Sequence, residues 1–275
     1  MGNFDMLPFE ITLEFLSRVP AETILERKLV SKAWRNVVQH PSFSQRHLDR
    51  LNELDSDDSS GNLSLILYTT WSGEEELEPF YYTEYDEHLN RFTRTTRINV
   101  RPPFEKYDIL HSCNGLICFY AFHDHEKLYP QPAYICNPIT REYIVLPIVK
   151  RKGFLSGFGC SPSTNEYKAV RICNDRGDPN YGIIQVYTLG SGFEWRNGRK
   201  MDYDVICFSP RGVFANGAIH WVDNFKGTVV AFDLADEEFR ELPSLPHTVG
   251  GVELRALRGF YVLVITMLKC LTYGF

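Results

Sequence analysis

The chain has 275 residues, with 29 Lys and Arg against 35 Asp and Glu, which gives a formal net charge of −6. A surface that binds nucleic acid in general is normally basic, so this charge argues against nucleic acid as a partner. Hydrophobic residues make up 44% of the chain and aromatic residues 14%, enough for a sizeable core and a composition that favours β structure.

The first predicted helix lies in a segment that runs from Leu7 to Phe43. Pro8 suits the start of a helix, because the N–H that proline lacks would have no partner there. Ile11, Phe15 and Leu16 recur at helical spacing, and we expect them to share one face.

Two more short helices are predicted before the segment ends. Pro20 separates the first helix from a second, in which Ile24 faces inward together with Leu25 and Leu29. Ser31 is placed to cap a third helix, which ends before Pro41. That third helix carries an apolar stripe of Trp34, Val37 and Val38. A segment of roughly forty residues rarely folds alone without staples, metal or a partner, so part of its apolar surface is expected to belong to another protein.

The region that follows is predicted to be a linker and then a series of strands. Residues 52–62 (NELDSDDSSGN) are polar, acidic and small, as expected of a hinge or exposed loop. From Leu63 onward, strands alternate with turns rich in Gly, Pro, Asn and Asp.

An internal repeat stands out among these strands. Segments that begin at Tyr134, Ile183 and Val229 each show a strand, a polar turn and a second strand. A period of roughly 45–50 residues is typical of the four-stranded blades of a β-propeller. Each copy would be the outer hairpin of a blade, with Asn137-Pro138 and Asp233 opening the turns. A β-sandwich can mimic this spacing.

The candidate chemistry is sparse. A histidine and cysteine cluster could in principle bind zinc, but Cys113 and Cys118 are spaced unlike structural zinc knuckles, so no metal or other cofactor is expected. We interpret Gly157-Phe158-Gly159 as a blade turn rather than a dinucleotide loop, and His220-Trp221 as a packed blade position rather than a catalytic base. The remaining members of the histidine and cysteine cluster are His111, His123 and His125. One hairpin turn carries four carboxylates, Asp233, Asp236, Glu237 and Glu238. A glycosidase would need two carboxylates that face a cleft.

Compartment signals point inside the cell. Asp5, Glu10 and Glu14 interrupt any apolar core of a signal peptide. Seven cysteines without a C-x-x-C pair fit a reducing compartment better than a disulfide framework. We expect a cytoplasmic or nuclear protein without a membrane partner, since the apolar C-terminal stretch is too short to span a bilayer.

The N-terminal segment resembles an F-box. The resemblance rests on Leu7-Pro8, on residues 16–20 (LSRVP) and on residues 30–35 (VSKAWR), in order and at the usual spacing. Lys28 and Glu26 depart from the common pattern, which has cysteine and a basic residue there. The resemblance implies docking onto the Skp adaptor of a cullin-RING ubiquitin ligase. The implied adaptor contacts are Leu7, Pro8, Ile11, Leu16, Val30, Ser31 and Trp34. An ordinary helical hairpin that caps the next domain is the alternative.

The rest of the chain resembles the plant F-box associated domain. The matching phrases are CNGLIC at 113–118, NPITRE at 137–142, GFG at 157–159 with YK at 167–168, VY at 186–187 with WR at 195–196, and GVF at 212–214 with GAIHW at 217–221. The resemblance implies a kelch-like β-propeller that presents the ubiquitylation target. Family members usually continue with further blade strands, so we expect an incomplete ring, with Phe260–Met267 as one last strand or as cover for an open edge.

The expected architecture is therefore mainly β with a small α domain. It comprises an F-box at 1–50, an acidic linker at 51–62, a propeller at 63–259 and a divergent apolar segment at 260–275. The expected function is substrate recognition for an SCF-type ubiquitin ligase, without catalysis by the chain itself and with an unidentified target protein. The alternatives are a propeller hydrolase or lectin with an incidental helical cap, and a truncated decoy that occupies the adaptor without presenting substrate.

Overall fold

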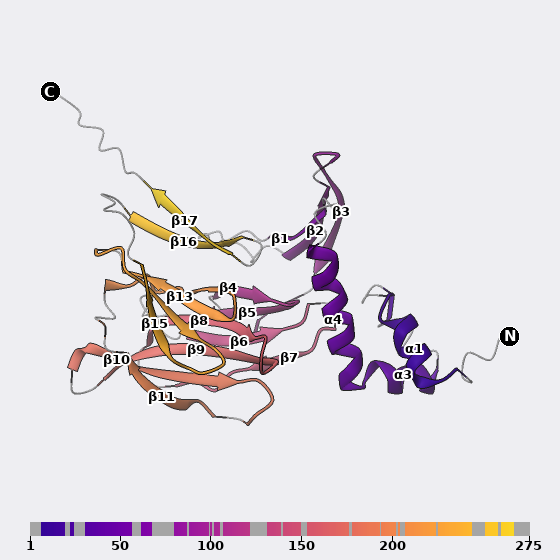
Figure 1. Ribbon diagram of the computed structural model, residues 1–275, viewed down its shortest axis with the longest axis horizontal. Helices are drawn as coiled ribbons and strands as arrows, with labels where there is room; N and C mark the ends of the chain where they lie inside the picture. Colours follow the sequence, from indigo (N-terminus) through magenta and orange to yellow (C-terminus); the bar gives the residue numbers. More distant parts are fainter. Residues whose placement is uncertain are drawn as a thin grey trace. The chain divides into compact units, whose positions relative to one another are not determined.

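The computed structural model describes most of the chain and divides it into two compact units, Met1–Arg101 with Asn137–Glu142, and Pro102–Cys136 with Tyr143–Phe275 (Figure 1). The described residues are 7–19, 23–24, 31–56, 62–67, 80–86, 88–98, 100, 102–104, 107–121, 131–138, 140–149, 153–175, 178–192, 194–201, 203, 207–223, 225–243, 251–257 and 260–266. The predicted domain boundaries stay predictions.

The first unit begins with helices and continues with a three-stranded antiparallel sheet. The helices are α1 (Phe9–Leu16), α3 (Lys32–Val38) and α4 (Pro41–Ser56). The sheet has the order β1-β2-β3, with β1 (Asn62–Leu67), β2 (Phe80–Asp86) and β3 (Arg91–Ile98). In the turn between β2 and β3, Asp86 Oδ1 accepts the N–H of Leu89 at 2.9 Å.

Helix α4 corrects one expectation about the linker. Residues 51–56, which were predicted to lie in a hinge or loop, form the last turns of this helix. The polar composition of the segment obscured leucines at positions 48, 51 and 54, whose spacing of three is a helical period.

The second unit consists of antiparallel sheets that follow one another along the chain (Figure 1). The first is β4 (Tyr107–Cys113), β5 (Leu116–Ala121), β6 (Gln131–Cys136) and β7 (Tyr143–Val145). The second is β8 (Gly153–Ser161), β9 (Glu166–Asp175), β10 (Asp178–Thr188) and β11 (Arg196–Met201). The third is β12 (Val213–Ala215), β13 (Ala218–Val222), β14 (Val229–Asp233) and β15 (Phe239–Leu242), and the last is the hairpin of β16 (Gly251–Leu257) and β17 (Phe260–Thr266).

The sheets are propeller blades, as the repeat predicted. Each four-stranded sheet is a meander in chain order, and its first strand packs toward the neighbouring blades, since β8 contacts both β4 and β12. The repeat copies that begin at Tyr134 and Val229 supply the third and fourth strands, β6–β7 and β14–β15, so they are outer hairpins as predicted. The middle copy, predicted over Ile183–Trp195, supplies only part of β10, because its predicted second strand ends at Trp195 and the fourth strand β11 begins at Arg196.

Two of these outer hairpins share one turn geometry. The N–H of Arg141 donates to the carbonyl of Asn137 at 2.9 Å, and the N–H of Glu237 donates to the carbonyl of Asp233 at 3.0 Å. Arg141 and Glu237 have φ of 63° and 59°. The side-chain oxygens of Asn137 and Asp233 also accept N–H groups within their turns, as the predicted role of these residues requires.

The blades pack through two apolar clusters. One lies between the second and third blades and includes Val170, Ile184, Ile219, Trp221 and Phe232, all fully buried. The other lies between the first and second blades and includes Leu110, Cys118, Tyr120, Ile135 and Phe158.

Gly157 and Gly159 explain how closely the blades approach, and they correct a second expectation. They lie inside β8, the innermost strand, rather than in a blade turn. A Cβ at Gly157 would lie 2.5 Å from Ile219 Cγ2, and one at Gly159 would lie 2.1 Å from the ring of Phe214. The glycines are needed because side chains of the next blade fill the space beside them.

Gly157→Ala is expected to destabilise the propeller by about 1–3 kcal/mol, the usual cost of overpacking a core. Ile219 is fully buried, so it has little room to move away from the added methyl group. Urea unfolding would measure the loss. The same substitution should cost less in an Ile219→Ala background, and an equal cost in both backgrounds would refute the steric explanation.

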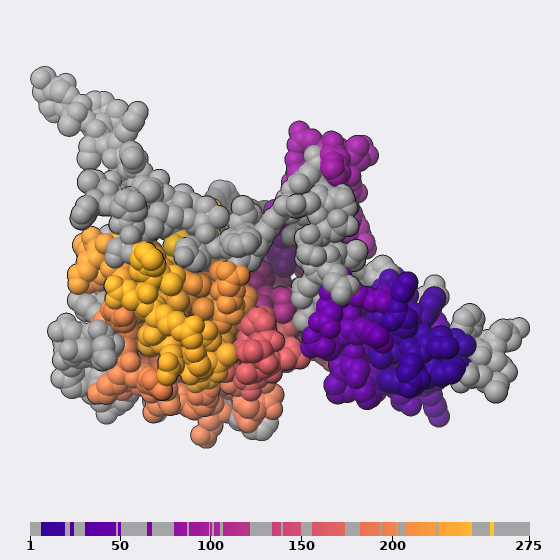
Figure 2. Space-filling view, in the orientation of Figure 1, coloured from indigo at the N-terminus to yellow at the C-terminus, as the bar shows by residue number. Residues whose placement is uncertain are grey.

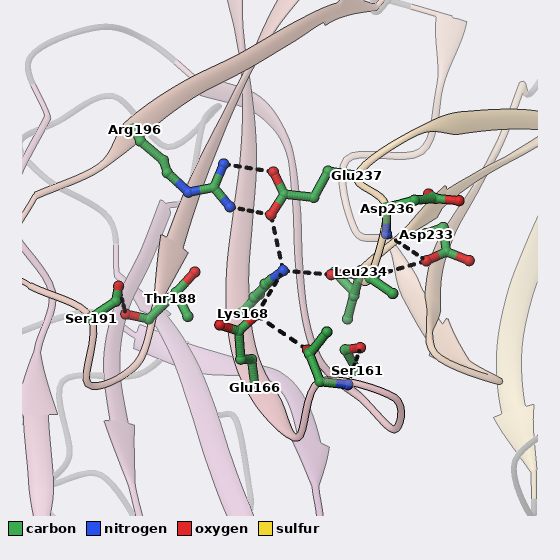
Figure 3. A network of polar contacts seen from close by, with 12 residues as sticks. Ser161, Glu166, Lys168, Thr188, Ser191, Arg196, Asp233, Leu234, Asp236 and Glu237 are labelled. Carbon is green, nitrogen blue, oxygen red and sulfur yellow. Dashed lines mark hydrogen bonds and ion pairs between the residues drawn. The ribbon is translucent and has the colours of Figure 1, made fainter.

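A polar network also joins the second and third blades (Figure 3). Lys168 on β9 has a side chain that is 4% exposed. Its Nζ donates to the carbonyl of Leu234 at 2.6 Å and to Glu237 Oε1 at 2.9 Å, and it lies 3.1 Å from Glu166 Oε2. Arg196 at the start of β11 holds the same Glu237 carboxylate through two nitrogens. Glu237 therefore anchors the turn of one blade to two strands of the other.

The C-terminal apolar segment forms a strand. β17 pairs with β16 from Gly251↔Thr266 to Leu257↔Phe260, as one of the two alternatives predicted for it; Met267 lies outside the described residues. No helix in the described part of the chain is long and apolar enough to cross a membrane.

Candidate interaction surface

Helix α1 is set by the proline that precedes it. Pro8 occupies the N-cap with extended backbone, and its carbonyl accepts the N–H of Thr12 at 3.0 Å and the hydroxyl of Thr12 at 3.1 Å. Glu10 lies in the first turn, where a negative charge interacts favourably with the helix dipole. The predicted helix start at Pro8 is confirmed.

One face of α1 forms the core of the helical cluster. Leu13 and Leu16 are buried on this face together with Thr12. They pack with Ile24, Val37 and Phe43 from the following segments, and with the half-buried Val19, Trp34 and Val38. The inward orientation of Ile24 is confirmed, while Leu25 and Leu29 lie outside the described residues.

The opposite face of α1 presents apolar side chains to solvent. Ile11 and Phe15, one helical turn apart, are each 53% exposed, and Leu7 is 42% exposed. Phe9 is also exposed, but it precedes Leu13 by four residues and so belongs to the side of α1 that carries the core residues. Scattered exposed apolar residues are common, but several on one short segment mark a contact surface. The N-terminal helical segment is drawn in indigo in Figure 2. We call Leu7, Ile11 and Phe15 the α1 apolar surface.

The α1 apolar surface corrects the predicted facing of the helix. Ile11, Phe15 and Leu16 were expected on one face, but Leu16 is 1% exposed and lies in the core with Leu13. Positions 11 and 15 are four apart and share a side, whereas 12, 13 and 16 form the other side. A short helix with apolar residues around most of its circumference does not by itself indicate which side is buried.

Helix α3 contributes the ring of Trp34 beside the α1 apolar surface. The ring of Trp34 lies 6.4 Å from the ring of Phe15, centroid to centroid, and Trp34 is half-buried against the helical core. The ring of Phe9 meets His40 edge-on at 5.1 Å. Trp34 borders the α1 apolar surface through its contact with Phe15, and its contact with the adaptor stays a prediction.

Ser31 has a structural role in addition to its predicted contact. Its hydroxyl accepts the N–H of Ala33 at 3.1 Å and caps α3, as predicted. Ser31→Ala is expected to lower the free energy of unfolding by about 1 kcal/mol, the typical value of an N-cap. Chemical denaturation of both chains would measure this. Ser31→Asp should restore the loss, because aspartate caps as well, and a Ser31→Asp variant as weak as alanine would contradict the capping role.

Charged groups beside the surface hold α1 against α4. The Glu14 carboxylate accepts hydrogen bonds from Arg18 Nε at 3.1 Å and from the guanidinium of Arg50 on α4, with Arg46 at 3.6 Å. These hydrogen bonds, first that of Arg18 and then that of Arg50, hold the pKa of Glu14 below its usual value. The arrangement fixes the orientation of α1 at an exposed site.

The predicted contact residues therefore fall into groups. Leu7, Pro8 and Ile11 are exposed, with Trp34 beside them, and Ser31 is half-buried as a cap. Leu16 is a core residue, and Val30 lies outside the described residues. The prediction missed the exposure of Phe9 and Phe15. The i, i+4 spacing places Ile11 and Phe15 on one side of α1, but no signal in the sequence shows that this side is the exposed one.

In the second unit, His220 and His111 are the described histidines that the sequence made candidates for catalysis or metal binding. Burial lowers the pKa of His220, whose Nδ1 lies 3.3 Å from the carbonyl of Val213, and Trp221 is fully buried. Burial lowers the pKa of His111 to about 4. Among the described side chains, no three or more potential metal ligands gather; His123 and His125 lie outside the described residues.

The carboxylates of the β14–β15 turn are occupied by structural contacts. Asp233 Oδ1 accepts the N–H groups of Ala235 and Asp236 at 2.8 and 3.3 Å. Glu237 is paired with Lys168 and Arg196. A hydrolytic pair would need carboxylates free to face a substrate, and these two stabilise a turn and a blade interface instead.

The chain thus combines a helical segment that has an exposed apolar face with a series of propeller blades. A family model described as "F-box associated beta propeller domain" matches residues 67–252. The chain belongs to this family, as an F-box protein with plant homologues.

Curated relatives from Arabidopsis thaliana match along most of the chain. "F-box protein At3g07870" is 28% identical over 88% of this chain and 61% of its own length. "F-box protein DOR" is 25% identical, covering 90% and 63%, and "F-box/kelch-repeat protein At3g23880" is 22% identical, covering 86% and 65%. This chain spans about three fifths of the length of the first of these relatives.

Proposed function

We propose that this chain is a substrate-recognition subunit of an SCF-type cullin-RING ubiquitin ligase. The observation that carries the proposal is the α1 apolar surface. Leu7, Ile11 and Phe15 stay exposed in a chain of the F-box associated family. A partner that covers this surface would remove these side chains from water, which is the main favourable term in such association. The Skp adaptor is the partner that the family assignment favours.

The propeller would then hold the target protein. Blade loops can vary without altering the sheet core, and the described inner strands and turns are occupied by packing and hydrogen bonds. The chain would act by proximity, because one part binds the ligase and another part raises the effective concentration of the target. The transfer chemistry would reside in other subunits, and the expected location is the cytoplasm or the nucleus.

Direct binding of purified Skp adaptor to the 275-residue chain tests the proposal. Co-elution as a complex of one copy each, with affinity in the micromolar range or tighter, is expected for a specific interface. Exchange of residues 63–259 between related receptors should transfer the target, with the adaptor unchanged. The proposal fails if the folded chain does not bind the adaptor, or if the target follows residues 1–50.

A further inference from the structure

Two cysteines from neighbouring blades meet inside the second unit. Cys113 ends β4 of the first blade, and Cys160 lies near the end of β8 of the second. Their sulfur atoms are 3.1 Å apart, and both thiols are free and nearly buried. A disulfide has a sulfur–sulfur distance of about 2.0 Å, so the two atoms need to approach by only about 1 Å.

The surroundings distinguish the two sulfurs. Cys113 donates its S–H to Cys160, and the exposed Asn114 donates its Nδ2–H to the same sulfur at 3.3 Å. The hydrogen bond from Cys113, followed by that of Asn114, lowers the pKa of Cys160. The same contact with Cys160, together with burial, raises the pKa of Cys113. Because two hydrogen-bond donors face the Cys160 sulfur, a thiolate is better stabilised there, and we assign the first attack to Cys160.

Three other described cysteines have different surroundings. Cys118, Cys136 and Cys173 are buried. Cys173 accepts from Arg171 Nε at 3.2 Å and donates to Gln185. Burial raises the pKa of Cys118 and raises that of Cys136 to about 12.

We propose that Cys113 and Cys160 form an oxidative modification site, at which a peroxide converts the two thiols into a disulfide that joins the first two blades. The Cys160 thiolate attacks hydrogen peroxide, the O–O bond breaks, and sulfenic acid and hydroxide form; the hydroxide takes a proton to become water. The Cys113 thiol then attacks the Cys160 sulfur. The S–S bond forms as the S–O bond breaks, and the hydroxyl group leaves as water with the thiol proton. Two thiols lose two electrons, and one peroxide gains them.

The bridge would have a mechanical consequence for the propeller. It would link residues 113 and 160, one on the first strand of each blade, at the inner side where β4 packs against β8. A cross-link that closes a loop of this kind restricts the unfolded chain and raises the melting temperature. The inference is independent of the adaptor interaction, because both cysteines lie in the second unit.

Peptide mapping of the full chain tests the proposal. The reduced chain is treated with hydrogen peroxide, quenched with catalase, alkylated in denaturant and digested without reduction. A peptide pair that links Cys113 to Cys160 is expected, together with a higher melting temperature, and dithiothreitol should reverse both. Cys118, Cys136 and Cys173 should remain alkylated. No linked pair, or Cys160 recovered mainly as sulfinic acid, would overturn the proposal.

Three variants separate the steps. Cys113→Ser should leave a sulfenic acid at Cys160 that reacts with dimedone. Asn114→Ala should slow formation of the link. Cys136→Ser, which removes a buried cysteine outside the pair, should leave the link and its rate unchanged. Circular dichroism of each reduced variant establishes whether it is folded. The peptide map of the wild-type chain tests the proposal even if a variant fails to fold. A disulfide from Cys160 to another cysteine in Cys113→Ser, or loss of the Cys113–Cys160 link in Cys136→Ser, would contradict the assignment.

Discussion

Replacing Ile11 and Phe15 together with alanine is expected to weaken binding of the Skp adaptor by about thirtyfold or more. Interface anchors that become buried commonly cost 2 kcal/mol or more when truncated, and both side chains are 53% exposed before binding. The free energy of unfolding should change by only about 0.5 kcal/mol, the usual range for surface positions. Titration calorimetry and urea unfolding of the same samples measure the two effects separately.

Two variants serve as controls for this prediction. Leu16→Ala should lower the free energy of unfolding by about 2–5 kcal/mol, because its side chain is buried in the helical core. Tyr143→Ala removes an aromatic side chain that is 65% exposed on β7, and should leave adaptor affinity unchanged. The interface assignment is wrong if the Ile11 and Phe15 double variant binds like wild type while Tyr143→Ala binds weakly.

The border of the α1 apolar surface gives a second check on the same interface. Leu7→Ala with Pro8→Ala, and Trp34→Ala alone, are predicted to weaken adaptor binding. Trp34 also packs against the helical core, so Trp34→Ala should reduce stability as well as affinity. The measured loss of adaptor affinity should be larger than the loss that results from the unfolded fraction of Trp34→Ala alone.

Local signals in the sequence predicted the parts of the fold that depend on neighbouring residues. Ser31 caps α3 because a hydroxyl two residues before an N–H can reach it, and this needs no tertiary contact. Asn137 and Asp233 open the outer hairpins for the same local reason. The spacing of the repeats placed the third and fourth strands of the first and third blades correctly, because each blade is one continuous meander. In the second blade it placed the third strand but not the fourth, which begins at Arg196.

Features that depend on distant residues were not predictable. In the sequence, Gly157 resembled a turn residue. Glycine is needed there because of Ile219 in another blade, and no local pattern reveals that contact. The burial of Leu16 and the exposure of Phe15 depend on which side of α1 meets α3. The contact of Cys113 with Cys160 joins residues 47 apart in sequence, and nothing in either local pattern points to the other.

Glu237→Gln is expected to lower the free energy of unfolding at neutral pH by about 1.5–3 kcal/mol, the range for hydrogen bonds to charged groups. The variant removes the negative charge that faces both Lys168 and Arg196. Glu166 stays near the Lys168 ammonium, which keeps the loss below that of an isolated buried charge. Lys168→Met serves as the partner variant, because it replaces the buried ammonium with an apolar side chain of similar length.

The effect of Glu237→Gln should depend on pH with a definite sign. Burial alone would raise the pKa of Glu237, but the hydrogen bonds from Arg196 and Lys168 outweigh it and leave the pKa below the ordinary value of 4.5. A carboxyl group with a lowered folded pKa stabilises the protein above its unfolded pKa, and this contribution fades as the pH falls through the folded pKa. The wild type should therefore lose its advantage over Glu237→Gln below about pH 4.5. Urea unfolding of both chains at neutral pH and at about pH 3.5 measures this difference; an advantage that stays constant across that range would show that Glu237 acts through the shape of its turn and not through its charge.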